Sequence, residues 1–299
     1  MELWIILSVA AAAFQTARFM LQKTLSMGPL TAAGATFARF FYAAPFAMLA
    51  ACAYVLAQGK GLPELGGFFW IYVLCGGLAQ ILATLLVVML FATRNFAVGI
   101  TLKKTEVIQT ALAGFLILGD RVSLAGMLAI LIGLVGVLVL SDPPEVGARG
   151  WARLRNRAAG LGLASGALFA ISAVTYRGAT LEVASDDVLL RASLSVAAVT
   201  ASQSLAMGLW LRWRAPGEVS TVWRARRVAV WLGLASLMGS FCWFTAFTLQ
   251  NAAYVFAVGQ VEVIFSMLAA VLFFREKITG RELWGIGLLT SSILVLVLL

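Results

Sequence analysis

The sequence feature that most constrains the fold is an apolar segment, marked by one glutamate, that occurs twice. TEVIQTALAGFLILGDRVS at Thr105–Ser123 returns as VEVIFSMLAAVLFFREKIT at Val261–Thr279. Both copies end in an acidic residue, a basic residue, a β-branched residue and a hydroxyl residue, so they align without a gap. Such self-similarity indicates a chain built from two homologous halves, each of which contributes one copy.

Both copies are apolar enough to lie within a membrane, and the composition extends this conclusion to the whole chain. Hydrophobic residues make up 62% of the sequence and charged residues only 12%, whereas about 25% of the residues of soluble domains are charged. Apolar stretches of about 20 residues recur along the chain, which is the length of helix that crosses about 30 Å of hydrocarbon. We therefore expect an all-α integral membrane protein.

Ten apolar stretches are expected to span the membrane as helices, five in each half. They lie near residues 3–22, 31–57, 67–93, 96–118, 123–140, 158–179, 187–211, 228–249, 252–274 and 280–298. Residues 1–141 would form the first five-helix repeat, 142–157 a basic cytoplasmic linker with paired prolines, and 158–299 the second repeat. Because five crossings reverse the chain direction, two similar halves insert as inverted-topology repeats, with a shared cavity between them near the midplane.

The lysines and arginines of the connections predict the orientation. Loops after odd-numbered spans are rich in basic residues, whereas those after even-numbered spans contain Lys60, Arg121 and Arg177. Because basic loops stay in the cytoplasm, both termini are predicted on the non-cytoplasmic side of a bacterial-type inner (plasma) membrane. This topology, together with anionic lipid, accounts for the net charge of +9, so no nucleic-acid partner is expected.

The residue inventory disfavours catalysis. The chain has no histidine, and its three cysteines, Cys52, Cys75 and Cys242, lie within predicted spans without metal-ligand spacing. No convergent nucleophile or metal-binding set is visible. We therefore predict that the protein is not an enzyme and that it holds no metal and no cofactor. An integral membrane enzyme or assembly factor acting on lipids is the least favoured alternative.

Polar residues inside the fourth and ninth spans are the candidates for a substrate pathway. A charge at the centre of a membrane helix costs about 2.5 to 3.5 kcal/mol on insertion scales, so such groups face the bundle interior or a wet cavity. Steps of three or four residues place most of them on one face of each helix. The candidates are Asn95, Lys103, Glu106 and Thr110 in the fourth span and Asn251, Tyr254, Gln260, Glu262 and Ser266 in the ninth.

The charged members of this set admit two interpretations. Four side chains can bind a polar or zwitterionic solute, because a carboxylate meets an ammonium group and a lysine meets a carboxylate: Glu106, Glu262, Lys103 and Lys104. Alternatively, Lys103 and Glu106 neutralise each other as an i,i+3 pair, and Glu262 is a structural hydrogen-bond acceptor. Both interpretations stay open at the level of sequence.

The basic residues of the spans differ in their expected directions. Adjacent helical positions point about 100° apart, so Lys103 is aimed along the polar face, while Lys104 is expected to pair laterally or to snorkel. The second half has Gly259 and Gln260 in place of this doublet, an asymmetry that favours a solute over a scaffold. Arg39, near the start of the second span, is expected to snorkel to the membrane interface.

Several of these segments together resemble those of one known family. Two five-helix halves, Arg39–Phe40 early in the second span, and GDRVS and REKIT in register are similar to the EamA family of the drug/metabolite transporter superfamily. The resemblance covers essentially the whole chain and implies a ten-helix fold that exports or exchanges small metabolites, with YddG-type amino-acid exporters nearest. The lysine doublet resembles the basic residues of organic-anion members. The first span has no acidic residue where small multidrug relatives place their proton-coupling glutamate.

The sequence therefore predicts an inner-membrane secondary transporter or exporter of small metabolites that works by alternating access. Amino acids or similar zwitterionic solutes are the expected cargo. The expected partners are a small-molecule solute and the lipid bilayer, with the protein a monomer or weak homo-oligomer. The main alternative is a proton-coupled multidrug or organic-cation antiporter, in which Glu106 or Glu262 carries the proton.

Overall fold

A computed structural model shows a bundle of α-helices. It describes residues 2–59, 61–91, 102–141, 157–265, 268 and 280–298. Six of the described helices are long and apolar enough to cross a membrane: α1 (Leu3–Ser26), α2 (Ala32–Gln58), α3 (Phe69–Phe91), α7 (Arg157–Leu181), α8 (Val188–Arg214) and α10 (Arg226–Leu249). The other helices are α5 (Glu106–Leu118), α6 (Leu124–Ser141), α9 (Pro216–Arg224), α11 (Ala252–Gly259) and α13 (Gly280–Leu298). The expectation of a helical membrane protein is confirmed for these residues.

Helix ends follow local capping chemistry. Side-chain oxygens of Thr31, Asp187 and Asn251 accept hydrogen bonds from backbone N–H groups in the first turns of α2, α8 and α11, which satisfies donors that the helix itself leaves open. Gly59 and Gly119 end α2 and α5 with φ of 62° and 70°, a left-handed conformation that glycine adopts without a steric penalty. These signals explain why the described spans begin and end within a few residues of the predicted limits.

One helix was not expected. The segment Pro216–Arg224, which the sequence analysis counts within a basic connection, forms α9. Proline at the first helical position and Glu218 in the first turn both favour a helix start. Glu218 Oε1 also accepts hydrogen bonds from the backbone N and the hydroxyl of Thr31, each at 2.7 Å, so α9 is fixed to the start of α2.

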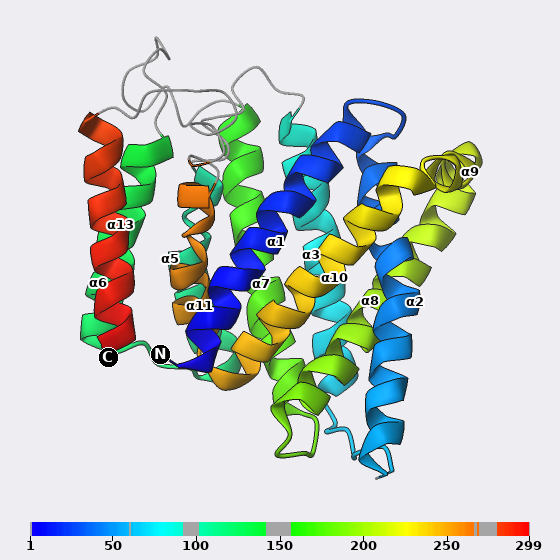
Figure 1. Cartoon of the computed structure of the whole chain (residues 1–299), viewed down its shortest axis with the longest axis horizontal. Helices are drawn as coiled ribbons and strands as arrows, with labels where there is room; N and C mark the ends of the chain where they lie inside the picture. Colours follow the sequence, from blue (N-terminus) through cyan, green and yellow to red (C-terminus); the bar gives the residue numbers. More distant parts are fainter. Residues whose placement is uncertain are drawn as a thin grey trace.

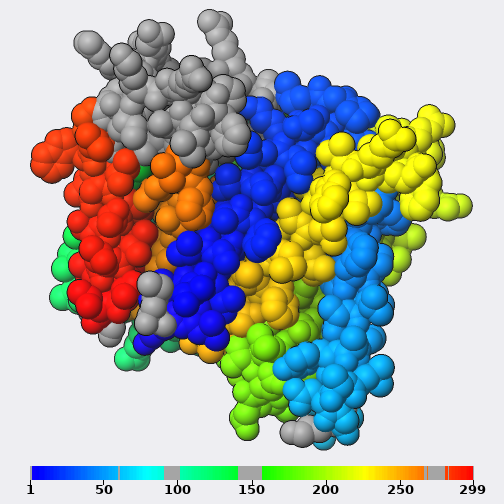
Figure 2. Space-filling view, viewed as in Figure 1, coloured from blue at the N-terminus to red at the C-terminus, as the bar shows by residue number. Residues whose placement is uncertain are grey.

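Helices of the first part of the sequence pack against helices of the second part. α1 packs along α10, and α3 packs along α7. α6 pairs with α13 at one end of the bundle, and α2 pairs with α8 at the other (Figure 1). α1 and α10 lie across one face of the molecule, between α13 and α2 (Figure 2). The two chain ends lie at the same edge, called here the terminal edge, and α9 lies at the opposite edge (Figure 1).

The α6–α13 pair shows how glycine allows close helix packing. A Cβ added to Gly136 would lie 2.8 Å from the backbone N of Leu289 and 2.9 Å from the carbonyl oxygen of Gly285. Both distances are too short for real contacts, so the helices can approach this closely only because Gly136 has no side chain. Ser292 fastens the pair by donating its hydroxyl to the carbonyl oxygen of Ala129 at 2.6 Å.

The fourth and ninth predicted spans are both interrupted, at equivalent places in the repeat. The backbone N of Thr105 donates to the carbonyl of Leu102 at 3.1 Å, and the backbone N of Val261 donates to that of Val258, also at 3.1 Å. Both bonds reach back three residues instead of four, which tightens the turn. The hydroxyl of Thr105 also donates to the Leu102 carbonyl at 2.7 Å, so the side chain competes for a helix acceptor.

This interruption corrects the expectation of one continuous stripe along each span. Glu106 is the first residue of α5, and Glu262 is the first helical residue after the turn that follows α11. Each repeat glutamate therefore begins a new helical segment, where the N-terminal end of the helix dipole favours a negative charge.

At the terminal edge, Arg177 of α7 joins three parts of the chain. Its Nε donates to Asp120 Oδ2 at 2.9 Å. Its Nη1 donates to the carbonyl oxygens of Phe247 and Gln250, at 2.6 and 2.9 Å. Asp120 is the acidic residue that ends the first copy of the repeated segment, so this residue has a structural contact at the rim of the bundle.

Candidate functional site

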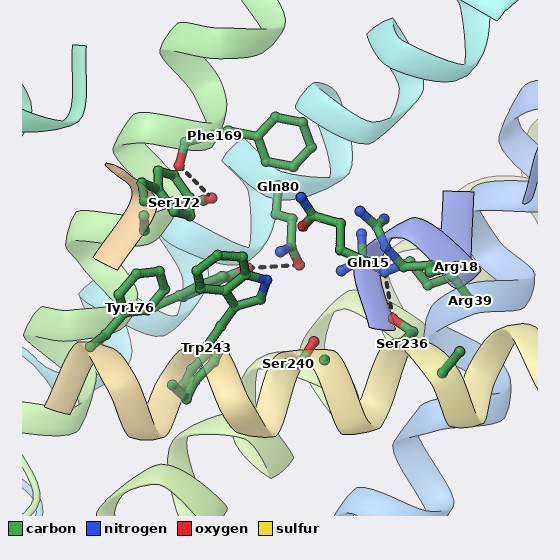
Figure 3. Close-up of a pocket in the computed structure, with 16 residues that line it drawn as sticks. Gln15, Arg18, Arg39, Gln80, Phe169, Ser172, Tyr176, Ser236, Ser240 and Trp243 are labelled. Atoms are coloured by element: carbon green, nitrogen blue, oxygen red, sulfur yellow. Dashed lines mark hydrogen bonds between the residues drawn. The ribbon is translucent and has the colours of Figure 1, made fainter. Parts of the chain in front are cut away.

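A cavity lies in the interior of the bundle, where α1, α2, α3, α7, α10 and α11 meet. It holds about 480 Å³ of space not filled by protein atoms, a volume that includes space open to solvent, and is called the arginine cavity here. Its wall combines side chains from both parts of the sequence, among them Gln15 and Arg18 of α1, Arg39 of α2, Gln80 of α3, Tyr176 of α7 and Trp243 of α10 (Figure 3). A cavity lined by both parts is the arrangement expected of a central binding site.

Two buried arginines lie at one end of this cavity (Figure 3). Arg18 and Arg39 are each only 3% exposed. Arg39 donates from Nε to Ser236 Oγ at 2.6 Å and from Nη1 to Thr84 Oγ1 at 3.1 Å. The guanidinium carbon of Arg18 lies 4.1 Å from the centre of the Phe19 ring. Among the described residues, Arg18 Nη1 has no hydrogen-bond partner.

The burial of Arg39 corrects the expectation that it snorkels to the interface. Its guanidinium points into the bundle, where hydroxyl groups of α3 and α10 bind it. Arg191, early in α8, donates instead from Nε to the carbonyl oxygen of Thr180 at 2.7 Å and is not part of the cavity wall. Sequence position near a helix end therefore does not separate an interfacial arginine from a buried one.

Arg18 was not predicted as a site residue, although the spacing of polar residues around it indicates one. Gln15, Arg18 and Gln22 follow one another at steps of three and four residues on a mostly apolar helix. This spacing places them on one helical face. Arg18 and Gln22 are buried, and both polar atoms of the Gln22 amide are without a hydrogen-bond partner among the described residues.

A second cavity of about 270 Å³, called here the glutamate cavity, adjoins the first. The two cavities share Gln15, Phe169, Trp243 and Phe256 as wall residues. The structure brings four predicted site residues together in this second wall, and they are Lys103, Glu106, Gln260 and Glu262. The candidate residues of the fourth and ninth spans thus converge beside the arginine cavity.

The charges of the glutamate cavity are paired. Lys103 Nζ lies 2.8 Å from Glu106 Oε1, and Lys104 Nζ lies 3.0 Å from Glu262 Oε2. Gln15 also donates to Glu262 Oε2, at 2.9 Å. All four charged side chains are buried. The Lys104–Glu262 pair joins the fourth predicted span to the ninth, whereas the Lys103–Glu106 pair lies within the fourth.

The other predicted site residues make contacts elsewhere. The hydroxyl of Thr110 donates to the carbonyl of Glu106 within α5 at 2.6 Å, and Asn251 caps α11. The hydroxyl of Tyr254 accepts a hydrogen bond from the backbone N of Ser123 at 2.9 Å, near the start of α6. These three side chains are not in the walls of the two cavities. Asn95 and Ser266 lie outside the described residues.

Aromatic rings form much of the wall that the two cavities share. Trp243 stacks on Phe247 with ring centroids 5.8 Å apart and meets Phe256 edge-on at 5.3 Å. Tyr176 stacks on Phe244 at 4.5 Å. These rings give the cavity a rigid apolar side opposite its polar residues.

Comparisons with known proteins agree with a membrane-transport fold. Residues 156–298, which contain α7 to α13, match the model of the EamA-like transporter family. No curated protein matches the chain. One solved structure, described only as a crystal structure of a protein, superposes with a TM-score of 0.69 at 16% sequence identity, over 99% of this chain and 96% of the other. At that identity, the similarity shows the fold alone.

Proposed function

We propose that the whole chain is a member of the EamA family of the drug/metabolite transporter superfamily. It acts as a multi-pass inner-membrane secondary transporter that moves small metabolites, such as amino acids and similar zwitterionic solutes, by alternating access. The observation that carries this proposal is an interior cavity whose wall contains buried charged residues from both parts of the chain. Buried charge inside a membrane protein usually marks a solute or ion pathway.

The packing of the helices supports an inverted repeat of two five-helix units, residues 1–141 and 158–299. In the repeat, α1 corresponds to α7 and α3 corresponds to α10. α1 packs on α10 and α3 packs on α7, so each contact between the units has its counterpart with the roles exchanged. The interruptions at Thr105 and Val261 are equivalent in the same way. Both observations are expected when a twofold axis relates the units.

Discontinuous helices support a transport site at this place. In transporters of this kind, broken helices at the interface between repeats expose helix ends and backbone groups to the solute. Glu106 and Glu262 each begin a helical segment beside the glutamate cavity. A zwitterionic solute can therefore place its ammonium group near the carboxylates and its carboxylate near the basic residues.

The antiporter alternative is less well supported. A proton carrier needs a carboxylate that exchanges its proton during the cycle, and Glu106 and Glu262 are each bonded to a lysine in this conformation. A cationic drug would also meet Arg18 and Arg39 in the adjoining cavity, and like charges repel.

Solute uptake by the purified protein in liposomes tests the proposal. We expect liposomes that are preloaded with unlabelled amino acids to take up labelled amino acids by exchange, without an imposed pH gradient. Protein-free liposomes and liposomes with heat-denatured protein serve as controls. Uptake of organic cations that requires a pH gradient, with no exchange of amino acids, would support the antiporter instead.

A further inference from the structure

The arginine cavity has more positive charge than its own residues neutralise. Arg18 and Arg39 are both buried in its wall. Within the part of the chain that the structure describes, no carboxylate oxygen lies within 4.0 Å of either guanidinium group. The two nearby glutamates, Glu106 and Glu262, are bonded to Lys103 and Lys104. Two cations thus remain without a carboxylate partner.

Buried charges that lack a counter-charge are costly for a protein to keep. The ring contacts of Arg18 with Phe19 and of Arg39 with Phe40, at 4.1 and 4.8 Å, offset part of this cost. Arg18 is repelled by Arg39 and is attracted, more weakly, by Glu262 and by Glu106, whose carboxylates are bonded to lysines. This arrangement favours an anion that enters from outside, because an anion between the two groups removes both the missing charge and the repulsion.

We propose that Arg18 and Arg39 bind the carboxylate group of the transported solute. This inference rests on the proposed function and assigns one end of its substrate. Arg18 Nη1 is a buried donor without a partner among the described residues, so it has an open hydrogen-bond position in the cavity. The planar guanidinium group matches the two oxygens of a carboxylate, and such charge-assisted bonds are among the strongest in proteins.

The rest of the wall defines the body of the solute. Tyr176, Trp243, Phe244 and Phe247 present aromatic rings to the same cavity. A flat apolar body attached to the carboxylate can lie against these rings. The substrate class is therefore a carboxylate with an apolar or aromatic body, and an ammonium group is not required for binding at this end.

Four small probes with the same phenyl body separate the head groups. They are 3-phenylpropionate, phenylalanine, phenethylamine and phenyl phosphate. We expect calorimetry with the full-length protein in nanodiscs to show binding of the two carboxylates, with phenethylamine at least about tenfold weaker. Binding of phenethylamine as tight as that of 3-phenylpropionate would overturn the proposal. Tighter binding of phenyl phosphate than of both carboxylates would overturn the assignment of a carboxylate.

Two arginine variants and one control test the residues. Arg18→Gln and Arg39→Gln should each weaken 3-phenylpropionate binding at least about tenfold, and Arg191→Gln should change it by less than about twofold, because Arg191 lies outside the cavity wall. Arg18→Lys, which keeps the charge, should recover part of the affinity. Unchanged binding by Arg18→Gln and Arg39→Gln would overturn the proposal.

The thermal unfolding temperature of each arginine variant shows whether a loss of probe binding comes from a folding defect. Arg39→Gln also loses hydrogen bonds to Ser236 and Thr84, so Arg18→Gln is the decisive variant. Its unfolding temperature should equal or exceed that of the wild type, because the change removes an unpaired buried cation. A clear fall would show that Arg18 is structural and would overturn the proposal.

The transport assay separates failure of this site from failure of the proposed function. Amino-acid exchange at full rate by both arginine variants would refute this site but not the transporter. Binding of the probes without any transport would refute the transporter but not the site.

Discussion

The two adjoining cavities differ in whether their buried charges have a counter-charge within the protein. The two glutamates of the glutamate cavity each have a lysine nitrogen within 3.0 Å, that of Lys103 for Glu106 and that of Lys104 for Glu262. In the arginine cavity, the described partners of Arg39 are neutral hydroxyl groups, and Arg18 has an aromatic ring beside it and an open donor. The difference teaches that burial of a charge does not by itself identify a binding group. In the arginine cavity, the missing internal counter-charge is the additional observation that points to a charge supplied by the solute.

The same difference predicts opposite responses to mutation. Removing one partner of a buried ion pair leaves the other charge uncompensated, which typically costs about 3 to 5 kcal/mol of stability. Removing a buried charge that has no partner removes the free-energy cost of burying it. Stability measurements can therefore distinguish buried charges that are paired within the protein from buried charges that are not, without knowledge of the solute.

The largest effect is expected for Glu262→Gln, which leaves Lys104 buried without its carboxylate. We expect a loss of about 3 to 5 kcal/mol in the free energy of unfolding, measured by denaturant titration in detergent. The double variant Lys104→Met/Glu262→Gln should recover most of this loss, because both charges are gone. If Glu262→Gln is as stable as the wild type, the glutamate cavity is not held together by its ion pairs and the comparison fails.

A smaller effect should separate the two lysines. Lys103 is in the wall of the glutamate cavity, whereas Lys104 lines a different small cavity near α6 and α13. Lys103→Met should raise the apparent KM for a carboxylate-bearing solute about tenfold, equivalent to about 1.4 kcal/mol, while Lys104→Met should mainly lower stability. Exchange kinetics in liposomes and unfolding in detergent give the two readouts. An equal or larger rise in KM from Lys104→Met would contradict the assignment of Lys103 to the solute side.

Once solute is bound, the smallest net effect is expected for Ser236→Ala, which removes the acceptor of the Arg39 Nε hydrogen bond. Loss of one such bond to a charged group costs about 1.5 to 3 kcal/mol when the donor stays unpaired, but a bound carboxylate can take its place. Stability without solute should therefore fall, while addition of 3-phenylpropionate should restore much of it in thermal unfolding. Ser240→Ala, one turn further along α10, is the control and should respond to the probe like the wild type. A Ser236→Ala protein that the probe does not stabilise would indicate that Arg39 does not reach the solute.

Sequence periodicity was sufficient for the spans but not for the interruptions within them. Apolar runs of about 20 residues give the positions of α1, α2 and α3, because hydrocarbon thickness determines helix length. The turn at Thr105 follows from a three-residue backbone bond and a side-chain hydrogen bond, and neither proline nor glycine marks it in the first copy. Periodicity therefore predicted one continuous helix there.

The candidate site likewise contains residues that the sequence predicted and residues that it did not. The charged residues of the repeat, such as Glu106 and Glu262, were found because charge in an apolar span is rare and conspicuous. Asn251 was taken for a pathway residue although asparagine directly before an apolar helix is a common N-cap. Arg39 was expected at the membrane interface and Arg18 was not predicted as a site residue, because distance from a helix end says nothing about which neighbours the rest of the bundle places around a side chain.

The contacts of Arg177 at the terminal edge have a mechanical consequence. One planar group holds Asp120 after α5 and two carbonyl oxygens at the end of α10, and its own backbone belongs to α7. A motion that separates α7 from α10 at this edge has to break both Nη1 bonds, one to each carbonyl oxygen. Separation of the two helices at this edge therefore depends on one side chain.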